Sequence, residues 1–140
     1  MNLKPYATLI QAAKEAQKMA YCPYSRYPVG AAVLTQSGKI FAGCNIESLT
    51  LISHVCAERA AIYNAFSHGE RGIRIVCTIS RNSLPCGTCR QMIEEFGSPK
   101  TRVLSLLSHP PSGKLKIVKT TIAKLLPHSH TAKQLKKPRL

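Results

Sequence analysis

Aspartate is absent from this chain of 140 residues, so every acidic side chain is a glutamate. Six glutamates stand against 20 lysines and arginines, and the formal net charge is +14 at pH 7. The search for a carboxylate catalyst is therefore limited to Glu15, Glu47, Glu58, Glu70, Glu94 and Glu95. The charge favours polyanions as partners. Because the sequence does not interleave basic and aromatic residues, we prefer a solvated basic surface to dedicated nucleic-acid binding.

Long apolar runs are also absent. No stretch approaches the roughly 18 apolar residues that indicate a membrane span, and we expect no membrane association. Residues 1–6 lack the apolar stretch and cleavage site of a secretory signal, which favours a cytoplasmic protein. In that compartment the six cysteines are expected to be reduced thiols or metal ligands rather than disulfides. The length and a hydrophobic content of 44% suit one globular domain.

The spacing of apolar residues predicts an alternation of helices and strands. Helices are predicted at 6–20, 56–66, 85–96 and 122–126. Strands are predicted at 29–34, 39–44, 73–80, 102–107 and 115–118, and the first two form a hairpin around Gln36-Ser37-Gly38. This order predicts an α/β fold, a three-layer α/β/α sandwich with a mixed five-stranded sheet. We expect the domain to span 1–127 and a mobile basic tail to occupy 128–140.

Two cysteines form a C-x-x-C motif in Pro85-Cys86-Gly87-Thr88-Cys89, at the start of a predicted helix. A helix N-terminus favours the thiolate form, because its unpaired N–H groups stabilise negative charge. Alone, the motif fits half of a zinc site, a dithiol redox pair or coincidence. A redox pair is typical just after a first strand, which is not the arrangement here.

A third cysteine, in Cys56-Ala57-Glu58, begins another predicted helix. Zinc prefers four ligands, so three thiolates leave one corner open for water; the predicted ligands are Cys56, Cys86 and Cys89. Zinc lowers the pKa of bound water from about 15.7 towards about 7. Glu58 is then predicted to move a proton from that water to the substrate nitrogen. Arg59 is predicted to offset the negative charge of the thiolates by donating to sulfur.

The alternative at this site is a closed, structural zinc centre. Cys44 or Cys77 would be its fourth thiolate, and it would leave Glu58 without a role. His54 is a further possible ligand, although a histidine two residues ahead of a cysteine more often faces solvent or a hydrogen-bond partner. We expect Cys77 to be a core residue, and Cys22 and Cys44 to be free thiols.

A cysteine, any residue and a glutamate, followed downstream by P-C-x-x-C, form the signature of zinc-dependent nucleobase and nucleoside deaminases. Four segments in the same order resemble the small homotetrameric cytidine deaminases: 24–32, 43–47, 56–59 and 85–91. The resemblance covers about residues 6–127. It implies hydrolysis of cytidine and deoxycytidine to uridine and deoxyuridine in pyrimidine salvage, by a zinc-bound hydroxide that attacks C4. It also implies one zinc ion per subunit and a homotetramer.

The same resemblance implies substrate contacts. Asn45 and Glu47 match the pair that hydrogen-bonds the ribose hydroxyls, and an amide and a carboxylate suit that role. Tyr27 matches a position that is usually Phe and packs against the pyrimidine. The chain departs from the family where Leu51 and Ile52 replace an aromatic residue and a glycine, and where His130 replaces a C-terminal aromatic residue.

These departures keep two alternatives open. The same zinc chemistry would act on a modified nucleoside, a nucleoside antibiotic or a base in nucleic acid. In the other alternative, a non-catalytic relative would bind nucleic acid and keep zinc as a structural element.

Overall fold

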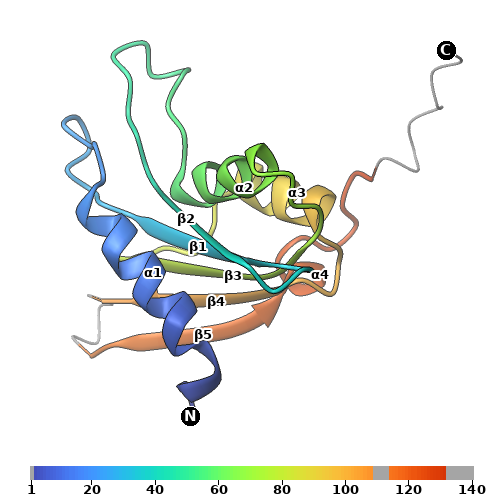
Figure 1. Ribbon diagram of the computed structural model, residues 1–140. Coiled ribbons are helices and arrows are strands. Elements are labelled where there is room, and N and C mark those ends of the chain that lie inside the picture. Colours follow the sequence, from blue (N-terminus) through green and yellow to red (C-terminus); the bar gives the residue numbers. More distant parts are fainter. Residues whose placement is uncertain (1, 109–113, 132–140) are drawn as a thin grey trace, which may run out of the picture.

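A mixed five-stranded sheet forms the centre of the protein (Figure 1). The computed structural model describes residues 2–108 and 114–131. The strand order is β2-β1-β3-β4-β5. The strands are β1 (Gly30–Thr35), β2 (Ile40–Cys44), β3 (Ile73–Ser80), β4 (Arg102–Leu107) and β5 (Lys116–Thr121). Only β3 and β4 pair in parallel, and the other three pairs are antiparallel.

Helices cover both faces of this sheet, as the layers in Figure 1 show. The helix α1 (Ala7–Lys18) follows a short 3-10 turn, η1 (Lys4–Tyr6), and packs on one face. The opposite face carries α2 (Ala57–Ser67), α3 (Gly87–Phe96) and the short α4 (Ile122–Leu125). The described part of the chain therefore forms the predicted three-layer sandwich.

The central strand β3 is buried on both faces. Val76 packs in the core beneath α2 and α3, and its neighbour Cys77 packs in the core beneath α1. Successive strand residues point to opposite faces, so a strand covered on both sides has a nearly continuous apolar sequence. Cys77 is a core residue, as predicted, and burial raises the pKa of its thiol to about 12.

Two glycines let helices approach the β1–β2 hairpin very closely. A Cβ atom at Gly30 would lie 2.1 Å from the Ala13 carbonyl oxygen in α1. A Cβ atom at Gly43 would lie 2.4 Å from the Ala61 backbone nitrogen in α2. Distances under 3.0 Å are essentially never seen for a real Cβ, so only glycine allows α1 and α2 to sit this near the strands. The hairpin thus fixes how far α2, the helix that begins after Cys56, lies from the sheet.

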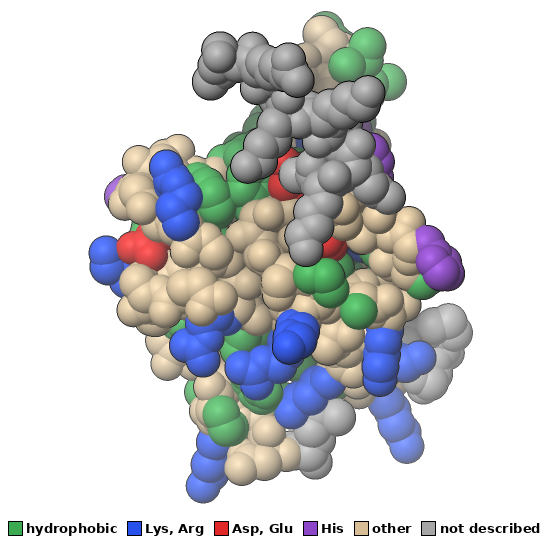
Figure 2. All heavy atoms as spheres, turned by 90° about the vertical axis from the view of Figure 1, so that its right-hand side faces the viewer, with side chains coloured by type: hydrophobic (Ala, Val, Ile, Leu, Met, Phe, Trp, Pro, Cys, Tyr) green, Lys and Arg blue, Asp and Glu red, His purple; other side chains and the backbone are tan. Residues whose placement is uncertain are grey.

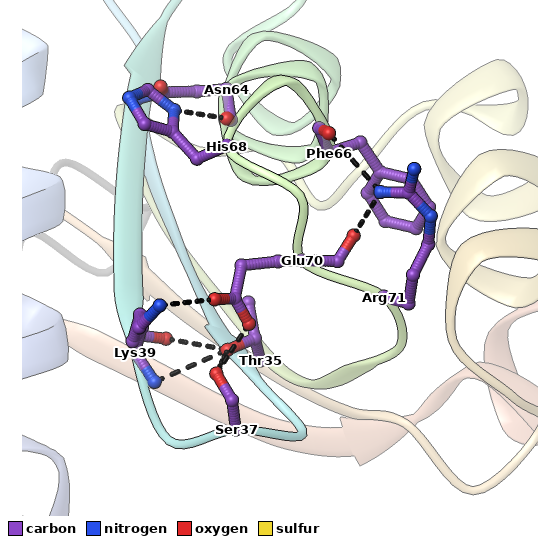
Figure 3. A network of polar contacts seen from close by, with 8 residues as sticks. All are labelled: Thr35, Ser37, Lys39, Asn64, Phe66, His68, Glu70 and Arg71. Atoms are coloured by element: carbon purple, nitrogen blue, oxygen red, sulfur yellow. Dashed lines mark hydrogen bonds and ion pairs between the residues drawn. The ribbon is translucent and has the colours of Figure 1, made fainter.

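The turn of that hairpin is tied to the far end of α2 by a buried carboxylate (Figure 3). Glu70 forms an ion pair with Lys39 at 2.9 Å and also accepts a hydrogen bond from the Ser37 hydroxyl. The Ser37 hydroxyl bond, followed by the Lys39 ammonium, lowers the pKa of the Glu70 carboxyl to about 2. These contacts join the segment after α2 to the β1–β2 turn, so both ends of the hairpin contact the helix layer.

The predicted order of helices and strands is confirmed, and three boundaries differ from the predicted ones by two residues or more. The first helix ends at Lys18 rather than at residue 20, because Tyr21 already pairs with Ile46 in an isolated bridge. The last strand extends to Thr121 rather than 118, since β5 pairs with β4 along its whole length. The third helix begins at Gly87, with Cys86 at its N-cap.

Most of the predicted basic tail, residues 132–140, lies outside the described residues. Within the described segments, no helix is long and apolar enough to cross a membrane.

Candidate metal centre and substrate cavity

Two helix starts bring the three predicted cysteine ligands together. Cys56 is the N-cap of α2 and Cys86 is the N-cap of α3, and both have extended backbone conformations. Their carbonyl oxygens accept the first helical hydrogen bonds, from Ala60 at 3.0 Å and Arg90 at 2.9 Å. Cys89 follows in the first turn of α3 and is fully buried.

The three sulfur atoms are close enough to bind one metal ion. All lie within 4.8 Å of one another, and the Sγ atoms of Cys56 and Cys86 are 3.9 Å apart. Thiolates at this spacing suit a tetrahedral zinc ion with Zn–S bonds of about 2.3 Å. No fourth cysteine or histidine joins this group among the described residues. The geometry therefore fits an open zinc site rather than a closed site with Cys44 or Cys77.

The local electrostatics favour a thiolate at Cys56. A hydrogen bond from Cys89 and then one from Arg59 lower the pKa of the Cys56 thiol to about 5. The hydrogen bond that Cys89 makes to Cys56 raises the pKa of the Cys89 thiol, and burial adds to this rise. The first proton therefore leaves Cys56, which prepares the cluster for a cation.

The Arg59 side chain lies beside the sulfur cluster formed by Cys56, Cys86 and Cys89. Its Nη2 atom lies 3.9 Å from the Cys56 sulfur and donates a hydrogen bond to the His54 carbonyl oxygen at 3.0 Å. Its Nε atom is buried without a partner among the described residues. The guanidinium thus lies where the sequence predicted it, beside a thiolate whose charge it partly offsets. His54 does not join the sulfur cluster, since its Nδ1 atom contacts the Leu51 carbonyl oxygen.

Glu58 projects from the first turn of α2 and is only 5% exposed. Burial raises the pKa of its carboxyl, and the negative charge of Cys56 raises it further. A carboxyl that holds a proton more tightly than usual suits an acid and base that exchanges protons with a bound substrate. Glu58 and two of the cysteines, Cys56 and Cys86, line one cavity.

This cavity measures about 450 Å³, and all three residues predicted to bind the substrate line it. Its walls include Tyr27, Asn45 and Glu47, together with Glu58, Cys56 and Cys86. Small-molecule sites commonly have volumes of about 300–1,000 Å³. The space therefore suits a ligand of nucleoside size.

Asn45 and Glu47 also hold the wall of the cavity in place. The Asn45 amide donates to the Tyr27 carbonyl at 2.9 Å and accepts from the Val29 amide at 2.9 Å. The Glu47 carboxylate accepts hydrogen bonds from the backbone and hydroxyl of Ser25, and the hydroxyl bond lowers the pKa of this carboxyl. Both side chains are thus preorganised by the segment 25–29 that precedes β1, contacts that the sequence does not reveal.

The sequence also missed the partners of Tyr27. Its hydroxyl lies 2.9 Å from both the Asn82 side-chain oxygen and the Ser83 hydroxyl, and it accepts from the Asn82 amide at 2.9 Å. The Arg81 guanidinium lies 5.2 Å from the ring centre. These residues form the turn before Pro85. Nothing in their composition indicates a contact with a residue more than 50 positions away.

The segment between Asn45 and Cys56, where the sequence departs from the family pattern, forms a projecting loop at the top of Figure 1. Ile46 and Val55 close it with two backbone hydrogen bonds of 3.0 and 2.9 Å. Between them, Leu49, Leu51 and Ile52 are exposed, and Ile52 is 92% exposed. Leu51 has a φ of 59° and also lines the cavity.

Three thiols beside a buried carboxyl, in a cavity of nucleoside size, define a hydrolytic zinc site of the deaminase type. A family model described as "Cytidine and deoxycytidylate deaminase zinc-binding region" matches residues 4–105. This chain belongs to that family of cytidine and deoxycytidylate deaminases. The resemblance inferred from the four sequence segments is thereby confirmed.

Individual relatives agree with this assignment. A cytidine deaminase from Sporosarcina psychrophila is 40% identical over 132 residues, which cover 91% of this chain and 92% of the relative. A crystal structure of cytidine deaminase from Burkholderia pseudomallei superposes with a TM-score of 0.75 at 35% identity, covering 89% of this chain and 98% of that one. A blasticidin-S deaminase from Bacillus cereus is 31% identical over 134 residues, covering 88% and 90% of the two chains.

Proposed function

We propose that this protein hydrolyses cytidine and deoxycytidine to uridine and deoxyuridine, with release of ammonia. The observation that carries the proposal is the position of Glu58, buried in the first turn of α2 and lining the same cavity as the sulfur cluster. The reaction consumes one water molecule, whose oxygen becomes the C4 carbonyl oxygen of the product while the amino nitrogen leaves. In pyrimidine salvage, this step converts a cytosine nucleoside to a uracil nucleoside.

Zinc held by Cys56, Cys86 and Cys89 would supply an activated water as the nucleophile at neutral pH. Glu58 takes the proton of the attacking water on a carboxylate oxygen. It delivers this proton to N3 of the pyrimidine, then takes the remaining hydroxyl proton from the new C4 oxygen and passes it to the amino nitrogen, which leaves as ammonia when the C4 carbonyl forms. Burial in the cavity keeps bulk water from competing for these protons. Arg59 keeps Cys56 ionised throughout by donating to its sulfur.

Asn45 and Glu47 are proposed to bind the ribose. Each Asn amide nitrogen has two hydrogens, and only one of them is committed to the Tyr27 carbonyl. The Glu47 carboxylate, with its pKa lowered, stays ionised and is a strong acceptor for a hydroxyl. The ring of Tyr27 is proposed to pack against the pyrimidine, because it lines the cavity and its hydroxyl is fixed by the Asn82–Ser83 turn.

The assembly is proposed to be a homotetramer with one zinc ion per subunit, located in the cytoplasm. The exposed apolar side chains of Leu49, Leu51 and Ile52 support association, since large clustered apolar side chains often mark protein contacts. Cys22 and Cys44 form no disulfide, which suits a reducing compartment. Light scattering of the zinc-loaded protein tests the tetramer, and a monomer at assay concentration would refute it.

The direct test is ammonia release from cytidine and deoxycytidine by zinc-loaded protein. We expect turnover by the wild type, and loss of turnover with full zinc content in Glu58→Gln. That variant keeps the shape of the side chain and removes its proton-carrying ability. Zinc-loaded wild type that leaves both nucleosides unchanged would refute the proposal.

A second candidate substrate is a modified cytosine nucleoside. It is favoured by Leu51, which lines the cavity where the sequence departs from the family pattern, and by the similarity to a blasticidin-S deaminase. A panel of cytidine, deoxycytidine, blasticidin S and base-modified cytidines separates the candidates by their kcat/KM values. The non-catalytic alternative requires that no member of the panel is turned over.

A further inference from the structure

We infer that this protein has a second binding surface, distinct from the cavity, which takes the phosphate backbone of single-stranded nucleic acid. We call it the Tyr6 basic cluster and define it by Tyr6, Arg102 and Lys119, with the neighbouring Lys4. The three segments that form it are far apart in the sequence. The fold therefore creates an interleaving of basic and aromatic residues that the sequence does not show.

Tyr6 contacts two cations in this cluster. The Lys119 ammonium is 4.7 Å from the ring centre and the Arg102 guanidinium carbon is 5.9 Å from it. Arg102 Nη1 also donates to the Tyr6 hydroxyl at 3.2 Å, and Lys119 Nζ donates to the Asn2 carbonyl at 3.4 Å. An aromatic face attracts cations, so the ring holds both side chains in place before a ligand arrives. A fixed pair loses less side-chain entropy on binding an anion.

Neither cation has an acidic partner among the residues that the structure describes. The two ion pairs there are Lys18 with Glu15 and Lys39 with Glu70. Arg102 has five N–H donors and Lys119 has three. Among the described residues, each side chain donates one hydrogen bond to a protein oxygen, so most of these donors are available to a ligand. Two unpaired cations over one ring repel each other, and a bound phosphate would remove that repulsion.

The surrounding surface is almost free of acids. Glu58, Glu70 and Glu94 are buried, Glu47 accepts hydrogen bonds from Ser25, and Glu15 pairs with Lys18, which leaves Glu95 on α3 as the exposed glutamate without an ion pair among the described residues. Figure 2 shows lysine and arginine side chains gathered over the lower half of one face, with few carboxylates among them. A positive potential over an extended surface attracts a polyanion more strongly than it attracts a single small anion.

Nucleic acid fits this surface better than a lipid membrane does. A membrane-binding face combines cations with apolar side chains that enter the bilayer. Here the exposed Leu49, Leu51 and Ile52 belong to the loop at the top of Figure 1, while β5 and the N-terminal segment lie at the bottom. Leu115 is exposed just before β5, but one leucine does not form an apolar face. The lysines of β5 also discourage strand pairing at the sheet edge, a role that by itself predicts no affinity for nucleic acid.

The test uses a short fluorescein-labelled oligothymidylate, which contains no cytosine and so cannot be a substrate. Anisotropy is measured with zinc-loaded full-length protein over a range of salt concentrations. We expect binding that weakens with salt. The double variant Arg102→Gln/Lys119→Gln should bind about 25-fold more weakly at about 0.1 M salt, because each single-strand phosphate contact contributes roughly 0.7 to the salt slope. Its slope should fall by about 1.4, and its turnover of cytidine should match the wild type.

Lys14→Gln/Lys18→Gln is the matched control. It removes the same charge from α1, at least two helical turns and about 12 Å from Tyr6, which exceeds the Debye length of about 10 Å at 0.1 M salt. We expect a much smaller loss of affinity. Equal losses in the two double variants would overturn the proposal, because binding would then follow net charge alone.

Three further results would overturn it. In one, the wild type does not bind oligothymidylate. In another, phosphatidylserine vesicles or inorganic pyrophosphate compete as well as unlabelled oligothymidylate at equal phosphate concentration. In the third, only a full-length variant with glutamine at Lys133, Lys136 and Lys137 loses affinity, which would assign binding to the C-terminal segment. None of these results bears on cytidine turnover, so the deaminase proposal stands or fails separately.

Discussion

Replacing Gly43 by alanine should damage the metal centre although Gly43 is not part of it. The new Cβ would lie 2.4 Å from the Ala61 backbone nitrogen and 2.7 Å from the Ala60 Cβ. Ordinary contacts begin near 3.4 Å, so α2 must retreat from β2 by about 1 Å. Overpacking of this kind costs about 1–3 kcal/mol of stability.

The displaced helix carries Cys56 at its N-cap and Glu58 in its first turn, about one turn before the clash. A misplacement of about 1 Å in catalytic geometry can reduce the rate about 100-fold. We therefore expect Gly43→Ala to lower kcat/KM for cytidine by about that factor and to bind zinc more weakly. The unfolding midpoint should also fall by several degrees. Steady-state ammonia release, zinc titration and thermal denaturation measure these three effects.

Gly87→Ala is the matched control, because it introduces the same methyl group between two of the zinc ligands. No atom lies within 4 Å of the position of its new Cβ, and its backbone has no positive φ. We expect stability within about 0.5 kcal/mol of the wild type and nearly unchanged turnover. The opposite pattern, a tolerated Gly43→Ala and an inactive Gly87→Ala, would refute the reasoning from close approach.

Three further substitutions test other contacts. Arg59→Ala should weaken zinc affinity about 10–100-fold by removing the donor to Cys56, measured by chelator competition; unchanged affinity would contradict that role. Tyr27→Phe removes hydrogen bonds worth about 1–2 kcal/mol and should lower the free energy of unfolding by about that amount, measured by denaturant unfolding; an unchanged stability would show that the hydroxyl does not anchor the turn at Asn82 and Ser83. Glu70→Gln should weaken the dependence of stability on pH between 4.5 and 2. The wild-type carboxyl has a pKa of about 2 against 4.5 unfolded, so it stabilises the fold above pH 4.5 and loses this contribution as the pH falls to 2. Denaturation midpoints across that range measure it, and parallel curves for both proteins would contradict it.

Much of the fold was predictable because local patterns decided it. Residues 73–80 form an apolar run with branched side chains, and the observed strand has those limits. The cysteine positions were equally informative, because Cys56 and Cys86 each precede a strong helical segment. Two helix starts then bring sulfur atoms together from positions 30 residues apart.

Contacts that depend on three-dimensional packing could not be predicted. In the sequence, Asn82 is an ordinary turn residue; in the structure, its backbone N–H donates a hydrogen bond to the Tyr27 hydroxyl. Gly43 follows a strand pattern that does not reveal the helix above it. The pairing of Lys119 and Arg102 over Tyr6 requires both the sheet register and the placement of the N-terminal turn.

The bridge between Ile46 and Val55 has a consequence for how this protein can diversify. It closes the projecting loop before Cys56 is reached, so the register of β2 and the start of α2 do not depend on residues 48–53. Mutations can accumulate in that segment, or a library can be built into it, while the zinc ligands and Glu58 keep their positions. Substrate preference can thus change while the catalytic groups stay the same. Selection can act on the loop residues that line the cavity separately from the zinc ligands and Glu58.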